Sequence, residues 1–96
     1  MMLNPASPAR YPLAIVGAGA LGLSFAARLA ALGPVAVIAR SAARAAELRA
    51  GVEVGGVSFR PDAFGPDALP GADWVIVLVK AGDTAEAART ALAMGP

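Results

Sequence analysis

The feature that most constrains this chain is a glycine-rich turn that stands between two apolar segments near its amino end. Residues 13–16 are all apolar, which is typical of a short strand covered on both faces in a parallel sheet. After the turn, apolar residues recur at helical spacing and predict one apolar helix face, made of Leu21, Phe25, Leu29 and Leu32. The turn itself has the pattern G-x-G-x-x-G and consists of Gly17, Ala18, Gly19, Ala20, Leu21 and Gly22.

A strand, this turn and a helix in succession are the setting in which the pattern binds the diphosphate of a dinucleotide. Gly17 would allow the tight turn, Gly19 would let a diphosphate approach the backbone, and Gly22 would let the helix pack closely on the strand. The start of the helix adds N–H groups and a partial positive charge. The alternative is a tight turn that binds nothing.

The apolar stretch from residue 13 to residue 32 also resembles a signal peptide or a membrane span. Arg28 would then lie in the hydrocarbon at a cost of about 2.5–3.5 kcal/mol, and the glycines of the turn weaken a lipid-exposed helix. We favour a globular chain, which agrees with a composition of 57% hydrophobic and 16% charged residues.

The remaining patterns alternate between strands and helices. Gly33 and Pro34 predict the end of the first helix, and Ser41 is a suitable N-cap for a second helix. Asp83 and Glu86 have the spacing of a capping box at the start of the last helix. The other expected segments are a strand at 35–39, a hairpin at 52–59, a loop at 60–71, a strand at 74–79 and a helix to about residue 94.

This alternation predicts an α/β fold of the Rossmann type, an open parallel sheet joined by right-handed crossovers. Residues 1–10 are interpreted as a flexible N-terminal arm and residues 11–96 as a partial dinucleotide-binding domain. The sheet is expected to be incomplete at one edge, where the strand that ends at Lys80 should have a further neighbour. The 96-residue chain should therefore be marginally stable, self-associate, or come from a longer polypeptide.

The residue after the second strand indicates which dinucleotide is bound. An NAD site carries an acid about twenty residues beyond the glycines, where it binds the ribose 2′-hydroxyl. This chain has Arg40 there, and a guanidinium binds a 2′-phosphate through paired hydrogen bonds. Ser41 could add a hydroxyl, and Arg44 could add a second cation. We therefore predict NADP(H) as the cofactor; the alternative is a solvated arginine at a strand end.

Lys80 closes the apolar strand at 74–79, beside the place where the strand order of such a sheet reverses and ligands bind. The alternative is a lysine that extends into solvent from a strand end. Asp83 and Thr84 are interpreted as helix caps rather than ligands. The sequence has no histidine and no cysteine, and we nominate no catalytic residue and no metal ligand. A net charge of +1 predicts no nucleic-acid or membrane partner.

Three segments together resemble the ketopantoate reductases (2-dehydropantoate 2-reductases). They are residues 13–22, the strand end at residues 38–40 and residues 77–81. The glycine segment alone is shared by many dehydrogenases, whereas the arginine after the second strand and the Val-Lys-Ala ending after Trp74 are more selective. The resemblance covers nearly the whole chain but only about the first third of such an enzyme.

The resemblance implies a cytoplasmic, NADPH-dependent reduction of a 2-keto acid to a 2-hydroxy acid in pantothenate biosynthesis. It also implies that the glycines hold the diphosphate, that Arg40 meets the 2′-phosphate, and that Lys80 lies at the cofactor. The catalytic lysine and glutamate of the family belong to a helical second domain, so none is carried over. A related reductase of another substrate and a nucleotide-sensing module without turnover remain alternatives, and a homodimer is left open.

Overall fold

Four parallel strands form the central sheet of the computed structural model, which describes residues 10–95. The strands are β1 (Arg10–Val16), β2 (Val35–Ile38), β5 (Asp62–Phe64) and β6 (Gly71–Val77). Their order in the sheet is β5-β2-β1-β6, so β1 lies between β2 and β6. Because the chain first adds β2 and β5 on one side of β1 and then adds β6 on the other, the strand order reverses between β1 and β6.

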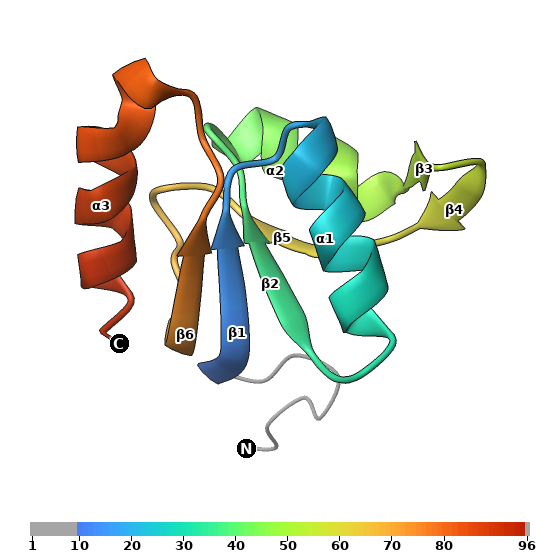
Figure 1. Ribbon diagram of the computed structural model, residues 1–96, viewed down its shortest axis with the longest axis horizontal. Helices are drawn as coiled ribbons and strands as arrows, with labels where there is room; N and C mark the ends of the chain where they lie inside the picture. Colours follow the sequence, from blue (N-terminus) through green and yellow to red (C-terminus); the bar gives the residue numbers. More distant parts are fainter. Residues whose placement is uncertain (1–9, 96) are drawn as a thin grey trace.

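Helices cover both faces of this sheet (Figure 1). On one face lie α1 (Ala20–Ala30) and α2 (Ala42–Ala50), and on the other lies α3 (Thr84–Ala93). A one-turn 3-10 helix, η1 (Ala81–Asp83), precedes α3. A small antiparallel hairpin of β3 (Val52–Val54) and β4 (Val57–Phe59) follows α2. The predicted α/β fold with an open parallel sheet is confirmed.

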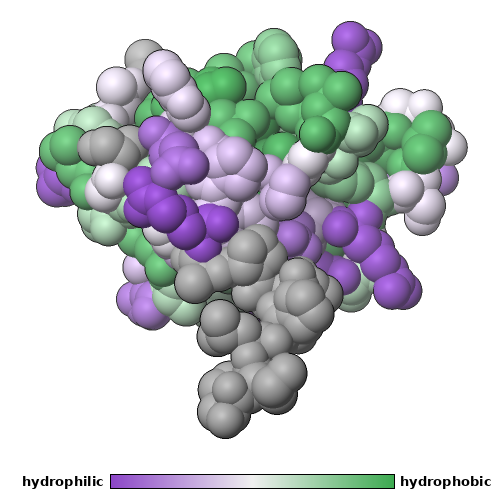
Figure 2. Space-filling view, turned by 90° about the horizontal axis from the view of Figure 1, so that it is seen from below, coloured by the Kyte–Doolittle hydropathy of each residue, from purple (hydrophilic) through white to green (hydrophobic). Residues whose placement is uncertain are grey.

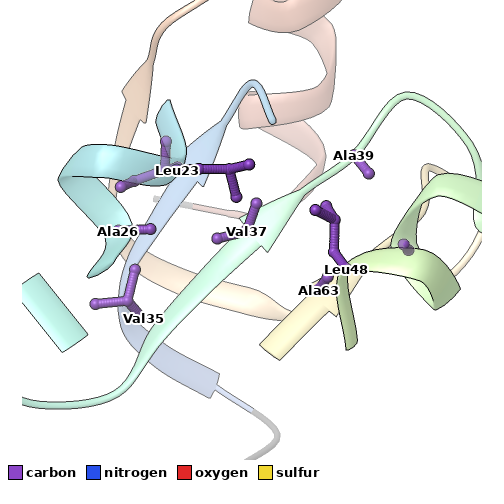
Figure 3. Packing of buried hydrophobic residues seen from close by; sticks show 9 residues of the cluster. Leu23, Ala26, Val35, Val37, Ala39, Leu48 and Ala63 are labelled. Atoms are coloured by element: carbon purple, nitrogen blue, oxygen red, sulfur yellow. The ribbon is translucent and has the colours of Figure 1, made fainter. Parts of the chain in front are cut away.

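The core consists of two apolar clusters, one on each face of the sheet. Between the sheet and helices α1 and α2, Ile15, Val37 and Leu48 are fully buried. Figure 3 shows side chains from both helices, β2 and β5 converging in this cluster. Under α3, Tyr11 and Met94 are buried beside small residues of the strands. Burial of a side chain the size of leucine contributes about 1.5–3 kcal/mol, so both clusters help to hold the strands in register.

The face of α1 that packs on the sheet is only partly the predicted one: Leu29 packs against the core cluster, but the other predicted residues do not. Leu21 and Phe25 are exposed, whereas the buried residues of the helix are Gly22, Leu23 and Ala26. Small residues at two of these positions let the helix axis lie close to β1 and β2. In a helix this rich in alanine the apolar pattern runs around most of the circumference, so the spacing of its large residues did not identify the buried side.

Several boundaries also differ from the prediction. α1 ends with Ala31 as its C-cap, so Gly33 lies beyond the helix and does not cap it. The segment 60–71, predicted as a loop, contains the three-residue strand β5, and β6 begins earlier and ends earlier than the predicted 74–79. Arg10, assigned to the N-terminal arm, is the first residue of β1; the rest of that arm lies outside the described residues.

The residues interpreted as helix caps have different outcomes, and Thr84 is the first residue of α3 rather than its cap. Ser41 caps α2, because its Oγ accepts a hydrogen bond from the N–H of Arg44 at 3.1 Å. Asp83 stands at the cap position of α3, but its side chain makes no capping hydrogen bond, so the predicted capping box with Glu86 is wrong. The carboxylate of Asp83 instead pairs with Arg40. An ion pair with a residue from another part of the fold therefore replaces the predicted capping hydrogen bond.

β6 is one of the two edge strands of the central sheet within residues 10–95. Trp74 and Ile76 align with Leu13 and Ile15 of β1, so they face the same side as α1, yet Trp74 is 75% exposed. Seen from below, Figure 2 shows apolar surface gathered along one side of the molecule.

The apolar stretch that suggested a membrane span is divided between β1, the glycine turn and α1. Among the helices of residues 10–95, none has the length and the apolar character needed to cross a membrane. α1 has 11 residues, and a membrane span needs about 20.

Candidate functional site

A cleft with a volume of about 240 Å³ opens at the carboxyl ends of the strands, where the strand order reverses. Segments that follow β1, β2 and β6 form its walls together with the first turns of α3. Ligands of open α/β sheets bind at this place because the connections diverge to opposite faces and leave a crevice. The lining residues are 16–19, 38–40 and 78–80, with Pro66, Asp83, Glu86, Ala87 and Thr90.

Two glycines of the turn are required by the fold itself. Gly17 has a φ of +126°, which side chains rarely adopt, and a Cβ there would collide with the carbonyl oxygen of Leu78. A Cβ on Gly22 would collide with the carbonyl oxygen of Gly17. The N–H of Gly17 donates to the carbonyl oxygen of Ile38 at 3.2 Å, which joins the turn to the end of β2. These contacts fix the turn tightly between α1 and the ends of three strands.

Gly19 differs from both of them, because nothing lies within 4 Å of the position that its Cβ would take. Its backbone lines the cleft and is exposed, and it is the N-cap residue of α1. No side chain caps this helix, and its first turn contains no acid. The first N–H groups of a helix have no partner inside the helix, so this end of α1 offers donors and a partial positive charge to an anion in the cleft.

Two cations stand at other parts of the cleft wall. Arg40 follows β2 with its side chain 82% exposed, and its Nη2 lies 3.2 Å from Oδ2 of Asp83 at the end of η1. Lys80 follows β6 and is exposed. Helix α3 also brings the carboxyl group of Glu86 to the cleft. The cleft thus combines two cations and a helix N-terminus with two acids, one of which already holds Arg40.

The structure brings five of the predicted site residues to the cleft and leaves four outside its wall. Gly17, Ala18, Gly19, Arg40 and Lys80 line it. The four others are Ala20, Leu21, Gly22 and Ser41; the first three form the first turn of α1 next to the cleft, and Ser41 Oγ caps α2.

Four residues that line the cleft were not predicted from the sequence to belong to the site: Pro66, Asp83, Glu86 and Thr90. Pro66 follows β5, the strand that was not predicted, so nothing in the local pattern places it near the glycine turn. Glu86 and Thr90 lie four residues apart on α3, and helical spacing alone puts them on one face. Asp83, which the sequence suggested only as a cap, lines the cleft and pairs with Arg40.

One of three comparisons with known proteins gives a match. The family model described as ketopantoate reductase PanE/ApbA matches residues 13–95, which include the glycine turn, Arg40 and Lys80. Neither the curated proteins nor the solved structures gave a significant match. Because the family match covers most of the sequence, the chain belongs to the ketopantoate reductase PanE/ApbA family.

Proposed function

We propose that this chain is the NADP(H)-binding part of a cytoplasmic reductase that converts a 2-keto acid, ketopantoate, to a 2-hydroxy acid in pantothenate biosynthesis. The observation that carries the proposal is the open backbone of Gly19 at the start of α1. Gly17 and Gly22 lack side chains because the fold has no room for them, but Gly19 lacks one where room is plentiful. Gly33 has equal room but lies outside the cleft wall, so the support comes from where Gly19 lies: at the N-cap of α1 and in the cleft wall, where a ligand that approaches the backbone would account for a missing side chain.

The residues of the cleft fit the parts of a dinucleotide. The diphosphate would lie against the N-terminus of α1 and the backbone of Gly19, and Arg40 would hold the 2′-phosphate. Lys80, which follows the strand next to β1, would lie beside the bound dinucleotide. When bound, NADPH supplies the hydride for reduction of a carbonyl group. The proposal gives the residues of this chain a role in binding and orienting the cofactor, and the family resemblance assigns the acid–base groups to a second domain.

The first test separates ligand binding from folding at Gly19. Gly19→Val should weaken NADPH binding at least about tenfold, because the new side chain fills the space against which the diphosphate would lie. Gly33→Val is the matched control, since a Cβ at Gly33 also meets nothing within 4 Å and the residue lies outside the cleft wall. Calorimetric titration and thermal melting of both variants measure binding and folding. Unchanged affinity in a folded Gly19→Val protein would remove the main support for the proposal.

The second test concerns the phosphate on the adenosine ribose. The wild-type protein should prefer NADPH to NADH, and Arg40→Asp should lower or reverse this preference. Hydrogen bonds to charged groups contribute about 1.5–3 kcal/mol, so the loss of affinity for NADPH should be about ten- to a hundredfold. Titration of the wild-type protein and of Arg40→Asp with NADPH and with NADH measures these affinities. A wild-type preference for NADH contradicts the proposed specificity.

The reaction is tested with the full-length protein, because substrate contacts are expected in the second domain. Oxidation of NADPH that depends on ketopantoate supports the complete proposal. Turnover with another 2-keto acid alone would show a related reductase. Tight binding of NADPH without any turnover would show a nucleotide-sensing module.

A further inference from the structure

The carboxylate of Asp83 is placed unusually for a residue at the start of a helix. It makes no capping hydrogen bond to α3, although it stands at the cap position. It lies 3.2 Å from the guanidinium of Arg40, which also lines the cleft and is 43 residues away in the sequence. Of the acids in residues 10–95, Asp83 is the one that forms an ion pair with Arg40.

This ion pair joins the cation that would meet a 2′-phosphate to an acid that could meet a 2′-hydroxyl. In a Rossmann site for NAD, an acid at the end of the second strand accepts a hydrogen bond from the ribose 2′-hydroxyl. Here the second strand is followed by Arg40 instead, and the acid arrives at the same place from η1. The cleft therefore holds both a partner for a 2′-phosphate and a partner for a 2′-hydroxyl, and each neutralises the other.

We propose that Asp83 is a specificity-determining residue that lowers the preference of the cleft for 2′-phosphorylated dinucleotides and lets NADH compete. The inference rests on the proposed function, since it assumes that a dinucleotide binds with its adenosine ribose near Arg40. A 2′-phosphate must displace Asp83 from the guanidinium and is repelled by the carboxylate that remains nearby. A 2′-hydroxyl meets no such repulsion and can donate to the same carboxylate.

The effect should be modest, because both partners are partly exposed. The side chains of Arg40 and Asp83 are 82% and 44% accessible to solvent, and ion pairs of this kind are weak. Asp83→Asn keeps the shape of the side chain but removes its charge. We expect the ratio of the dissociation constants, NADH over NADPH, to rise about two- to fivefold in this variant.

Two further variants test whether the change in the ratio comes from the ion pair between Asp83 and Arg40. Glu86→Gln removes the same charge from the same cleft wall, but Glu86 forms no ion pair with any of the described residues. It should therefore change the ratio less than Asp83→Asn does. In an Arg40→Ala background, Asp83→Asn should also have a smaller effect, because only the direct repulsion by the carboxylate remains and there is no guanidinium from which Asp83 must be displaced. Thermal midpoints close to that of the wild type would show that the variants are folded.

The outcomes separate this inference from the proposed function. An increase in the ratio that is specific to Asp83→Asn and dependent on Arg40 supports the inference. An unchanged ratio, or the same change in Glu86→Gln, overturns the inference while a wild-type preference for NADPH leaves the proposed function standing. A decrease in the ratio also overturns it, because Asp83 would then hold Arg40 ready for the phosphate. If the wild type binds neither dinucleotide, both proposals are wrong.

Discussion

At the scale of single residues, the hydroxyl of Tyr11 links two strands that are not neighbours in the sheet. Tyr11 lies in β1 and is 2% exposed, and its hydroxyl donates a hydrogen bond of 3.0 Å to Oδ2 of Asp62 in β5. Its ring also packs edge-on against Phe64, with ring centroids 5.7 Å apart. Burial of the hydroxyl, then the hydrogen bond and the negative charge of Asp62, raise the pKa of Tyr11 to about 12.

This raised pKa predicts a loss of stability in alkali. The phenol of an unfolded chain loses its proton near pH 10, whereas the folded protein keeps it until about pH 12. Between these values the unfolded state binds fewer protons, so the free energy of unfolding falls as the pH rises. The stabilisation of the folded state that comes from the raised pKa of Tyr11 is fully present below about pH 10. Tyr11→Phe should show a smaller alkaline decrease than the wild type in urea unfolding measured from neutral pH upward; equal decreases would contradict the assignment.

At neutral pH the same variant should lose about 0.5–1.5 kcal/mol, the usual contribution of one hydrogen bond. The carboxylate of Asp62 is not left buried, because this residue is exposed and water can replace the hydroxyl. The site at the opposite ends of the strands should be unaffected, and unchanged NADPH affinity serves as the control.

At the scale of elements, the sequence predicts best the parts that are held by local interactions. β1, the glycine turn and the start of α1 follow from the apolar run and from glycines whose Cβ positions are blocked. The N-cap of α2 follows from Ser41, whose bond to Arg44 spans three residues. Such interactions form between residues that are close in the sequence, so the sequence pattern predicts them.

The elements that the sequence does not predict are those that depend on distant partners. β5 has three residues and exists because it pairs with β2, from which α2 and the β3–β4 hairpin separate it. Arg49 of α2 adds a hydrogen bond of 2.8 Å to the carbonyl oxygen of Ala63, again from outside the strand. The capping box at Asp83 fails for the same reason, because Arg40 comes from another element. The cleft wall formed by Pro66 and α3 could be known only after the sheet order was known.

At the scale of the whole molecule, the edge strand β6 presents a surface that is open to unwanted association. Its outer backbone has no strand partner within residues 10–95, and Trp74 on this strand is 75% exposed. Parallel strands are ordinarily covered on both faces, and a bare edge with large apolar side chains favours pairing between chains. We therefore expect the 96-residue chain to self-associate as its concentration rises.

Trp74→Lys tests this expectation, because a lysine on an edge strand opposes pairing. The variant should be less associated than the wild type in sedimentation experiments at equal concentration. Its free energy of unfolding should change by less than about 0.5 kcal/mol, since the side chain is mostly exposed. Leu32→Lys is the control, because Leu32 is 85% exposed but lies after α1. A wild-type chain that stays monomeric and melts sharply and reversibly would contradict the expectation.

The blocked glycines also limit how this turn can change in evolution. A side chain on Gly22 meets the backbone of Gly17, and a side chain on Gly17 meets the backbone of Leu78. When an obstacle is a side chain, a second substitution can shrink it, but a carbonyl oxygen is the same in every residue type. No compensating replacement is therefore open to either position. Gly19 has no such obstacle, so a descendant that no longer needed a ligand could replace it first and keep its fold.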